Sequence, residues 1–73
     1  MQVSGHIVAV QEQRFRLATD HGRVYLLTLG RHTRIDPNTL AQLHRRDAHV
    51  EVDFSGEPNL TGGVAHSVRE AAR

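Results

Sequence analysis

Residues 13–29 constrain the fold more than any other stretch, and their sequence is QRFRLATDHGRVYLLTL. From Arg14 to Thr19, apolar and polar residues alternate, which is typical of a strand with one buried face. Asp20-His21-Gly22 predicts a three-residue turn, because glycine adopts the positive φ that such turns use. The chain then returns as a second strand from Arg23 to Leu29. We therefore expect an antiparallel hairpin at the centre of the fold.

The length of the turn decides which residues of the hairpin face each other. With three turn residues, Leu17 faces Tyr25, and the side chains that point into the core are Phe15, Leu17, Tyr25, Leu27 and Leu29. The outward side chains are then Arg14, Arg16, Ala18, Val24, Leu26 and Thr28. A two-residue turn would shift the pairing by one residue and place Tyr25 outside, beside Ala18. We favour the three-residue turn.

The other segments are predicted from shorter patterns. Residues 3–12 form a strand in which Gly5 marks a bulge or a tight bend, as in a barrel strand that serves two sheets. A short helix begins at Asp36-Pro37, where aspartate caps free amides and proline suits the first helical position. Its buried face is formed by Leu40 and Leu43, three residues apart. The remaining segments are a strand over 48–54, a loop over 55–63, a final strand over 64–69 and a frayed tail over 70–73.

The order strand, strand, strand, helix, strand, strand is that of the OB-fold, a five-stranded Greek-key barrel. The phrases that carry a resemblance are Gly5-x-Ile7-Val8-x-Val10, Phe15-x-Leu17, Gly22-x-x-Tyr25-x-Leu27, Thr33 before the helix, and Val50-x-Val52. In these positions the chain resembles small bacterial OB-fold proteins of unknown function, which implies a fold and little else. We predict a mainly β, OB-like barrel with one short α-helix between strands three and four. An SH3-like barrel, which also closes five short strands, is the alternative.

Size and composition exclude several classes of protein. Seventy-three residues suffice for one domain, 1–73, and the absence of cysteine excludes disulfides and thiolate metal sites. No apolar stretch approaches the roughly 20 residues of a membrane helix, and the first residues lack the features of a signal peptide. We therefore expect a cytoplasmic protein of bacterial type that does not bind membranes. The histidines lie in no recognised metal-ligand spacing, so we predict no metal and no cofactor. They are His6, His21, His32, His44, His49 and His66.

Positive charge gathers in the first half of the chain, although the net charge is only +1. Residues 1–34 hold five arginines against two acidic residues, a charge of +3, whereas residues 35–73 hold four arginines against six acidic residues, a charge of −2. All nine basic side chains are arginine, which binds phosphate and carboxylate groups bidentately. A GC-rich genome that favours arginine codons is the alternative explanation.

The candidate site is an arginine-rich face on strands two and three. OB-folds that bind oligonucleotides use the outer face of these strands and the flanking loops. The corresponding residues here are Arg14, Arg16 and Arg23, with Arg31, Arg34 and the loop over 55–63 as extensions. A solvated arginine face without a ligand is the alternative, because the predicted register points all three aromatic residues inward. Those aromatic residues are Phe15, Tyr25 and Phe54.

Val24 and Leu26 form a second candidate surface, because outward aliphatic residues on a sheet mark protein contacts. Partial burial beneath the helix is the alternative explanation for them. Catalysis lacks support, since the chain has neither a nucleophile motif nor the lysine of a phosphate-binding loop. We therefore expect a non-enzymatic module with no small-molecule substrate that binds single-stranded or structured nucleic acid. The alternative is a module for protein–protein interaction or self-association.

Overall fold

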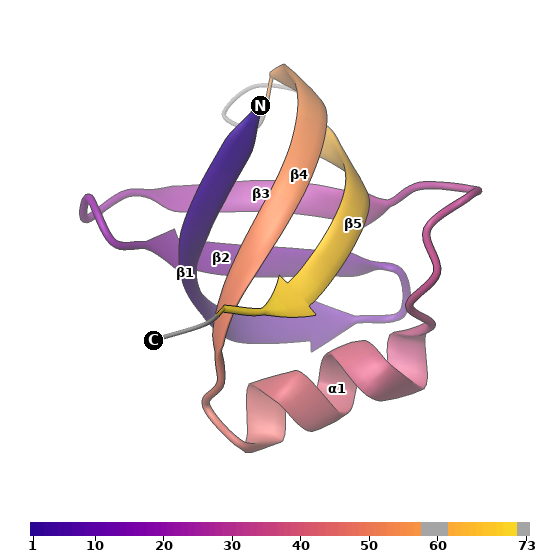
Figure 1. Cartoon of the computed structure of the whole chain (residues 1–73), viewed down its shortest axis with the longest axis horizontal. Coiled ribbons are helices and arrows are strands. Elements are labelled where there is room, and N and C mark those ends of the chain that lie inside the picture. Colours follow the sequence, from indigo (N-terminus) through magenta and orange to yellow (C-terminus); the bar gives the residue numbers. More distant parts are fainter. Residues whose placement is uncertain (58–61, 72–73) are drawn as a thin grey trace.

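A computed structural model describes residues 1–57 and 62–71, which form a closed five-stranded barrel with one short helix (Figure 1). The elements are β1 (Gln2–Gln11), β2 (Arg14–Thr19), β3 (Val24–Leu29), α1 (Pro37–Arg45), β4 (His49–Glu57) and β5 (Gly62–Glu70). Around the barrel the strand order is β1-β2-β3-β5-β4, and β4 closes onto β1. The β3–β5 pair is parallel and the other pairs are antiparallel. The predicted OB-like barrel, with its helix between strands three and four, is confirmed.

The central hairpin has the register of a three-residue turn. Leu17 pairs with Tyr25 across β2 and β3. The Thr19 amide donates a hydrogen bond to the Arg23 carbonyl oxygen at 2.7 Å, and Gly22 closes the turn with φ 83°. Glycine suits this position because other residues are strained at positive φ. The predicted register is therefore confirmed, and the two-residue turn is wrong.

β1 belongs to two walls of the barrel. Its first half pairs with β4 and its second half with β2, and Gly5 has a partner on both sides. The predicted tight bend is therefore at Gly5. The bulge lies further along β1, at Val8, where the register with β2 shifts between Ile7 and Ala9. A bulge explains why two adjacent apolar residues, Ile7 and Val8, occupy one strand: only the first of them is buried.

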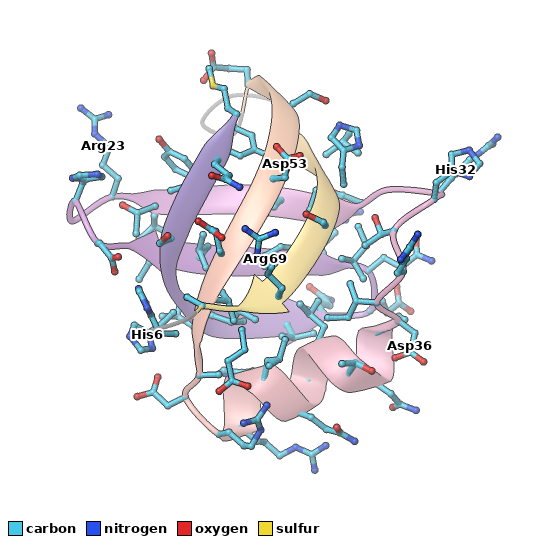
Figure 2. The ribbon with its side chains drawn as sticks, in the orientation of Figure 1. His6, Arg23, His32, Asp36, Asp53 and Arg69 are labelled. Atoms are coloured by element: carbon cyan, nitrogen blue, oxygen red, sulfur yellow. The ribbon has the colours of Figure 1, made fainter. Side chains whose placement is uncertain are left out.

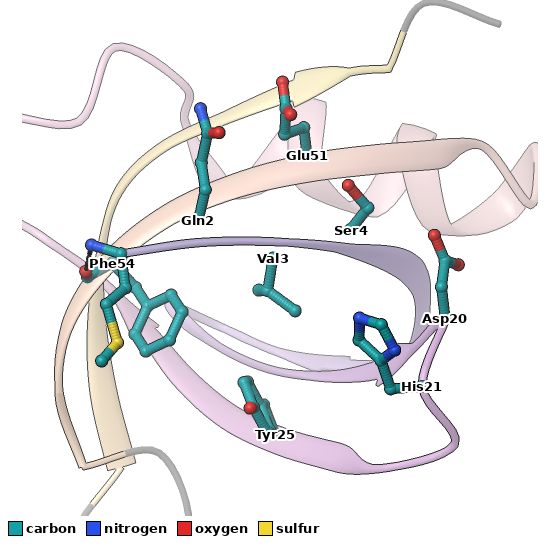
Figure 3. Close-up of a pocket in the computed structure, with 9 residues that line it drawn as sticks. Gln2, Val3, Ser4, Asp20, His21, Tyr25, Glu51 and Phe54 are labelled. Carbon is teal, nitrogen blue, oxygen red and sulfur yellow. Dashed lines mark hydrogen bonds between the residues drawn. The ribbon is translucent and has the colours of Figure 1, made fainter.

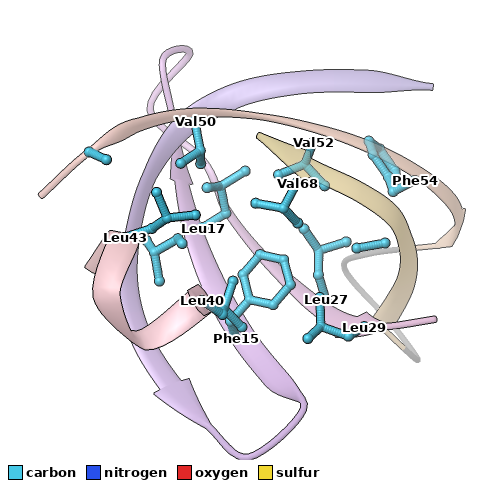
Figure 4. Close-up of a cluster of buried hydrophobic side chains, with 13 residues drawn as sticks. Phe15, Leu17, Leu27, Leu29, Leu40, Leu43, Val50, Val52, Phe54 and Val68 are labelled. Atoms are coloured by element: carbon cyan, nitrogen blue, oxygen red, sulfur yellow. The ribbon is translucent and has the colours of Figure 1, made fainter. Parts of the chain in front are cut away.

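The core fills the barrel and extends to α1, which covers one end of it (Figures 1 and 4). Its buried residues are Ile7, Phe15, Leu17, Leu27, Leu29, Leu40, Leu43, Ala48, Val50, Val52, Phe54, Ala65 and Val68. The helix contributes Leu40 and Leu43, as their spacing predicts. It begins where expected, because the Asp36 carboxylate accepts a hydrogen bond from the Thr39 amide at 2.8 Å. Tyr25 is the exception in the predicted inward set, since it is only partly buried.

The hairpin of β4 and β5 is longer than its composition suggests. β4 continues through Glu57, and β5 begins at Gly62, its partner in the ladder. The predicted loop over 55–63 is therefore wrong at both ends, and its residues 58–61 lie outside the described residues. The predicted frayed tail is wrong at its start, since β5 reaches Glu70 and the Ala71 amide donates to the His49 carbonyl oxygen at 2.8 Å. Residues 72–73 lie outside the described residues. Glycine and serine do not prevent pairing where a neighbouring strand supplies hydrogen-bond partners.

Candidate nucleic-acid interface

Arg14 and Arg16 lie together on the outer side of β2. They flank the buried Phe15, so the alternation of a strand turns both away from the core. Both line an open cleft of about 450 Å³, which is also lined by Ala9 and Leu26. Arg16 stands between these two residues, because it pairs with Ala9 on β1 and with Leu26 on β3. The cleft thus combines two guanidinium groups with an exposed aliphatic surface.

The charges of this face are not neutralised by neighbouring side chains. Arg69 pairs with Glu51, and Arg46 pairs with Glu70 at 3.2 Å, so both of these arginine ion pairs belong to the second half of the chain. Within residues 1–57 and 62–71, neither Arg14 nor Arg16 has such a partner. Figure 1 shows β2 and β3 on the wall of the barrel opposite β4. The outer side of β2 is therefore a positively charged surface. It lies on the opposite wall of the barrel from the carboxylate of Glu51 on β4.

The structure separates the other predicted arginines from this pair. Arg23 lies at the tip of the hairpin. Because it is two residues before Tyr25, the alternation along the strand places it on the side of Tyr25 and not on the side of the outward residues. Arg31 and Arg34 follow β3, and Arg34 lines a different shallow cleft, between α1 and β5. Figure 2 shows Arg23 and His32 at opposite ends of β3. Only two of the five predicted arginines therefore share the cleft on β2.

Among residues 1–57 and 62–71, no phenylalanine or tyrosine ring is exposed on the face of Arg14 and Arg16, although the buried Phe15 is among the residues that line their cleft. Phe15 and Phe54 are buried, and the ring of Tyr25 belongs to the interior side of β3. Contacts to bases on this face would therefore come from the flat guanidinium groups and from aliphatic side chains.

Val24 and Leu26 are both on the surface, with 57% and 39% of their area exposed. Burial beneath α1 is therefore not the explanation for these two apolar residues. Val8 and Val64 are also exposed, at 49% and 41%. These two were not predicted: the bulge turns Val8 outward, and Val64 pairs with the outward Thr28 in the parallel ladder.

A third cleft, which the sequence did not indicate, opens at one end of the barrel (Figure 3). It has a volume of about 510 Å³, and its apolar lining includes Val3, Tyr25 and Phe54. The rings of Tyr25 and Phe54 meet edge to face, with centroids 5.7 Å apart. Among the residues that the structure describes, β1 pairs with β2 from Gly5 onward and β3 pairs with β5 from Leu27 onward, and the cleft lies beside the strand segments that precede these pairings. We call this site the mouth cleft.

Three of the six histidines, His6, His49 and His66, make side-chain contacts among the described residues. His49 Nε2 lies 2.9 Å from Asp20 Oδ2, and the His49 ring packs on that of His6 with centroids 5.2 Å apart. His66 lies elsewhere and shares a hydrogen bond of 2.7 Å with the hydroxyl of Ser55. His6 and His66 are apart because β1 and β5 are not neighbours. In the part of the chain that the structure describes, no three such side chains are placed to hold a metal ion.

Comparisons with protein-family models, curated proteins and solved structures give no significant match to this chain. The described helix is also too short and too polar to cross a membrane. The class of protein is therefore defined by its OB-like barrel. Its function has to be inferred from the cleft on β2 and the mouth cleft.

Proposed function

We propose that this protein is a non-enzymatic nucleic-acid-binding module that holds a single-stranded or structured nucleic acid on the outer side of β2. The proposal rests on one observation: Arg14 and Arg16, without ion-pair partners among the described residues, line one cleft together with the exposed Leu26. Two residues apart on a strand, their backbones are separated by roughly 7 Å. They are therefore placed to contact different phosphate groups of one strand.

Phosphate contacts of this kind make binding strongly dependent on salt, because each contact releases a condensed counterion. For a single strand, the slope of log K against log salt concentration falls by about 0.7 for each phosphate contact. Replacing both arginines by alanine removes two contacts, so the slope should become less negative by about 1.4 and binding at low salt should weaken. The proposed location is the bacterial cytoplasm, where such a ligand is abundant.

The test is fluorescence anisotropy of a labelled oligonucleotide titrated with protein at salt concentrations from about 0.05 to 0.2 M. The variant R14A/R16A is compared with R45A/R46A, which removes the same number of positive charges at the C-terminal end of α1 and, with Arg46, also the ion pair to Glu70. We expect the first variant to lose most of the affinity and the second to lose little. Absence of binding at the lowest salt, affinity independent of salt, or equal losses in both variants would overturn the proposal.

A second candidate is self-association through the exposed aliphatic residues of β3. Val24 and Leu26 are adjacent outward positions on one strand, and both are substantially exposed. Sedimentation velocity at high protein concentration tests this role. A dimer that is lost in V24T/L26T supports it, whereas a monomer at every concentration excludes it.

A further inference from the structure

The mouth cleft contains the chain's one tyrosine in an unusual position. Tyr25 points to the interior side of β3, as its pairing with the buried Leu17 shows, yet it is only partly buried. Its ring is supported edge-on by Phe54, which is 4% exposed. In Figure 3, Tyr25 and His21 lie on one side of the opening and Val3 on another. An aromatic ring that is fixed by the core and still accessible provides a flat stacking surface.

Polar side chains of the hairpin turn border this cleft near the ring (Figure 3). His21 supplies ring nitrogens and Asp20 supplies carboxylate oxygens, whereas Ser4 and Glu51 point away from Tyr25. The Asp20 carboxylate is hydrogen-bonded to His49, and Glu51 is paired with Arg69. The rings of Tyr25 and Phe54 suit a flat group, and the Asp20 carboxylate disfavours a phosphate inside the cleft.

We propose that the mouth cleft binds one unstacked nucleobase, with Tyr25 as its stacking surface. A base matches the cleft because it is flat and carries donors and acceptors along its edges. The volume of about 510 Å³ lies within the range of small-ligand sites. The inference that this base belongs to a bound nucleic-acid strand rests on the proposed function. The inference that the cleft suits a base does not.

Arg23 gains a role in this arrangement. It is exposed at the end of the hairpin, beside the turn that carries Asp20 and His21, and it is two residues from Tyr25 (Figure 2). A phosphate attached to the bound nucleoside is repelled by the Asp20 carboxylate of this turn. The exposed Arg23 guanidinium lies beside the same turn and carries the positive charge to receive it.

The test uses the aromatic NMR signals of Tyr25, which are unambiguous because the chain has one tyrosine. Protein labelled at tyrosine is titrated with the four common nucleoside 5′-monophosphates, and ribose 5-phosphate serves as the control without a base. We expect the nucleotides to shift the Tyr25 signals by ring currents and ribose 5-phosphate to leave them unchanged. Equal shifts with both, or nucleotide binding that leaves Tyr25 unmoved, would overturn the proposal.

Variants separate stacking from other contributions. Y25L should weaken nucleotide binding about tenfold, the loss expected when a base–aromatic stack is removed, whereas Y25F should retain it. R23A changes only an exposed side chain, so it remains informative if Y25L fails to fold. It should weaken binding of the monophosphate and leave binding of the nucleoside unchanged. Equal affinity of R23A and wild type for the monophosphate would contradict the role of Arg23.

The two proposals fail in different ways. An abasic oligonucleotide keeps the phosphates and removes the bases, so it reports on the Arg14/Arg16 face alone. Salt-dependent binding of this oligonucleotide, with no effect of mononucleotides on Tyr25, would sustain the proposed function and overturn the mouth-cleft proposal. Mononucleotide binding in the mouth cleft, with no affinity for any oligonucleotide, would support the cleft and overturn the proposed function.

Discussion

The carbonyl oxygen of Ala18 lies so close to Gly5 that a Cβ atom built on the glycine would be 2.1 Å away from it. The Cα atom of Thr19 would be 2.8 Å from the same Cβ. Both neighbours are backbone atoms of β2, so they cannot rotate away as a flexible side chain would. Gly5 and the following His6 are also paired with β2 and β4 at once. The closure of the barrel therefore depends on a residue without a side chain at this point.

Gly5→Ala should destabilise the protein by about 2 kcal/mol or more, because the added methyl group forces the two strands apart. The free energy of unfolding measured in urea provides the test. Ser4→Ala, in the adjacent position, is the control and should change stability by less than about 0.5 kcal/mol. An unchanged midpoint for Gly5→Ala would contradict the packing described at this site.

Leu40→Ala should lower the free energy of unfolding by about 2–5 kcal/mol, the usual cost of a cavity at a buried leucine. Leu40 is fully buried between α1 and the barrel. The matched control is Leu26→Ala, because this leucine is 39% exposed and should contribute much less. Similar losses in the two variants would show that the outer face is covered in solution.

Asp36 should make stability depend on pH. Its pKa is lowered because the Thr39 amide, and then the Thr39 side chain, donate hydrogen bonds to the carboxylate. Because the pKa is lower in the folded state, the charged carboxylate stabilises the fold at pH values above its unfolded pKa of about 3.9. This stabilisation is lost as the pH falls through the pKa of the folded state. Asp36→Ala should therefore lower the melting temperature at neutral pH, with a difference from wild type that shrinks in acid.

Asp36→Asn provides the matched variant for this effect, because its amide oxygen still caps the helix but carries no titrating charge. It should be less destabilised than Asp36→Ala at neutral pH. Melting curves between acidic and neutral pH measure the difference. A gap between wild type and Asp36→Ala that stays constant with pH would show that the charge of the cap is unimportant.

Gly22→Ala should destabilise the hairpin by about 1 kcal/mol, through backbone strain alone. Gly22 has φ +83°, and no atom lies within 4 Å of a Cβ built on it, so no steric clash contributes. Gly22→Asn should cost less, because asparagine tolerates positive φ better. Thermal unfolding of the two variants beside His21→Ala tests this, and an equal melting temperature for Gly22→Ala and wild type would refute it.

The hairpin could be predicted from sequence because its signals are local. The alternation around Leu17 and the position of Gly22 depend only on residues near in the chain, and together they specify one register. The outward direction of Arg14 and Arg16 follows from the same alternation. That register also places Arg23 opposite the inward Thr19. The same alternation therefore implies that Arg23 does not share the outward face of Arg14 and Arg16.

The succession of strands along the chain, the capped helix and the inward faces could be predicted from sequence, because strand and helix periodicity act over a few residues. The places where strands separate follow from the three-dimensional fold. Among the described residues, the mouth cleft around Tyr25 lies beside the part of β1 that precedes its pairing with β2 and the part of β3 that precedes its pairing with β5. The pairing of Arg69 with Glu51 is likewise a contact between strands. Such features depend on distances between residues far apart in the chain, and local patterns carry no information about those distances.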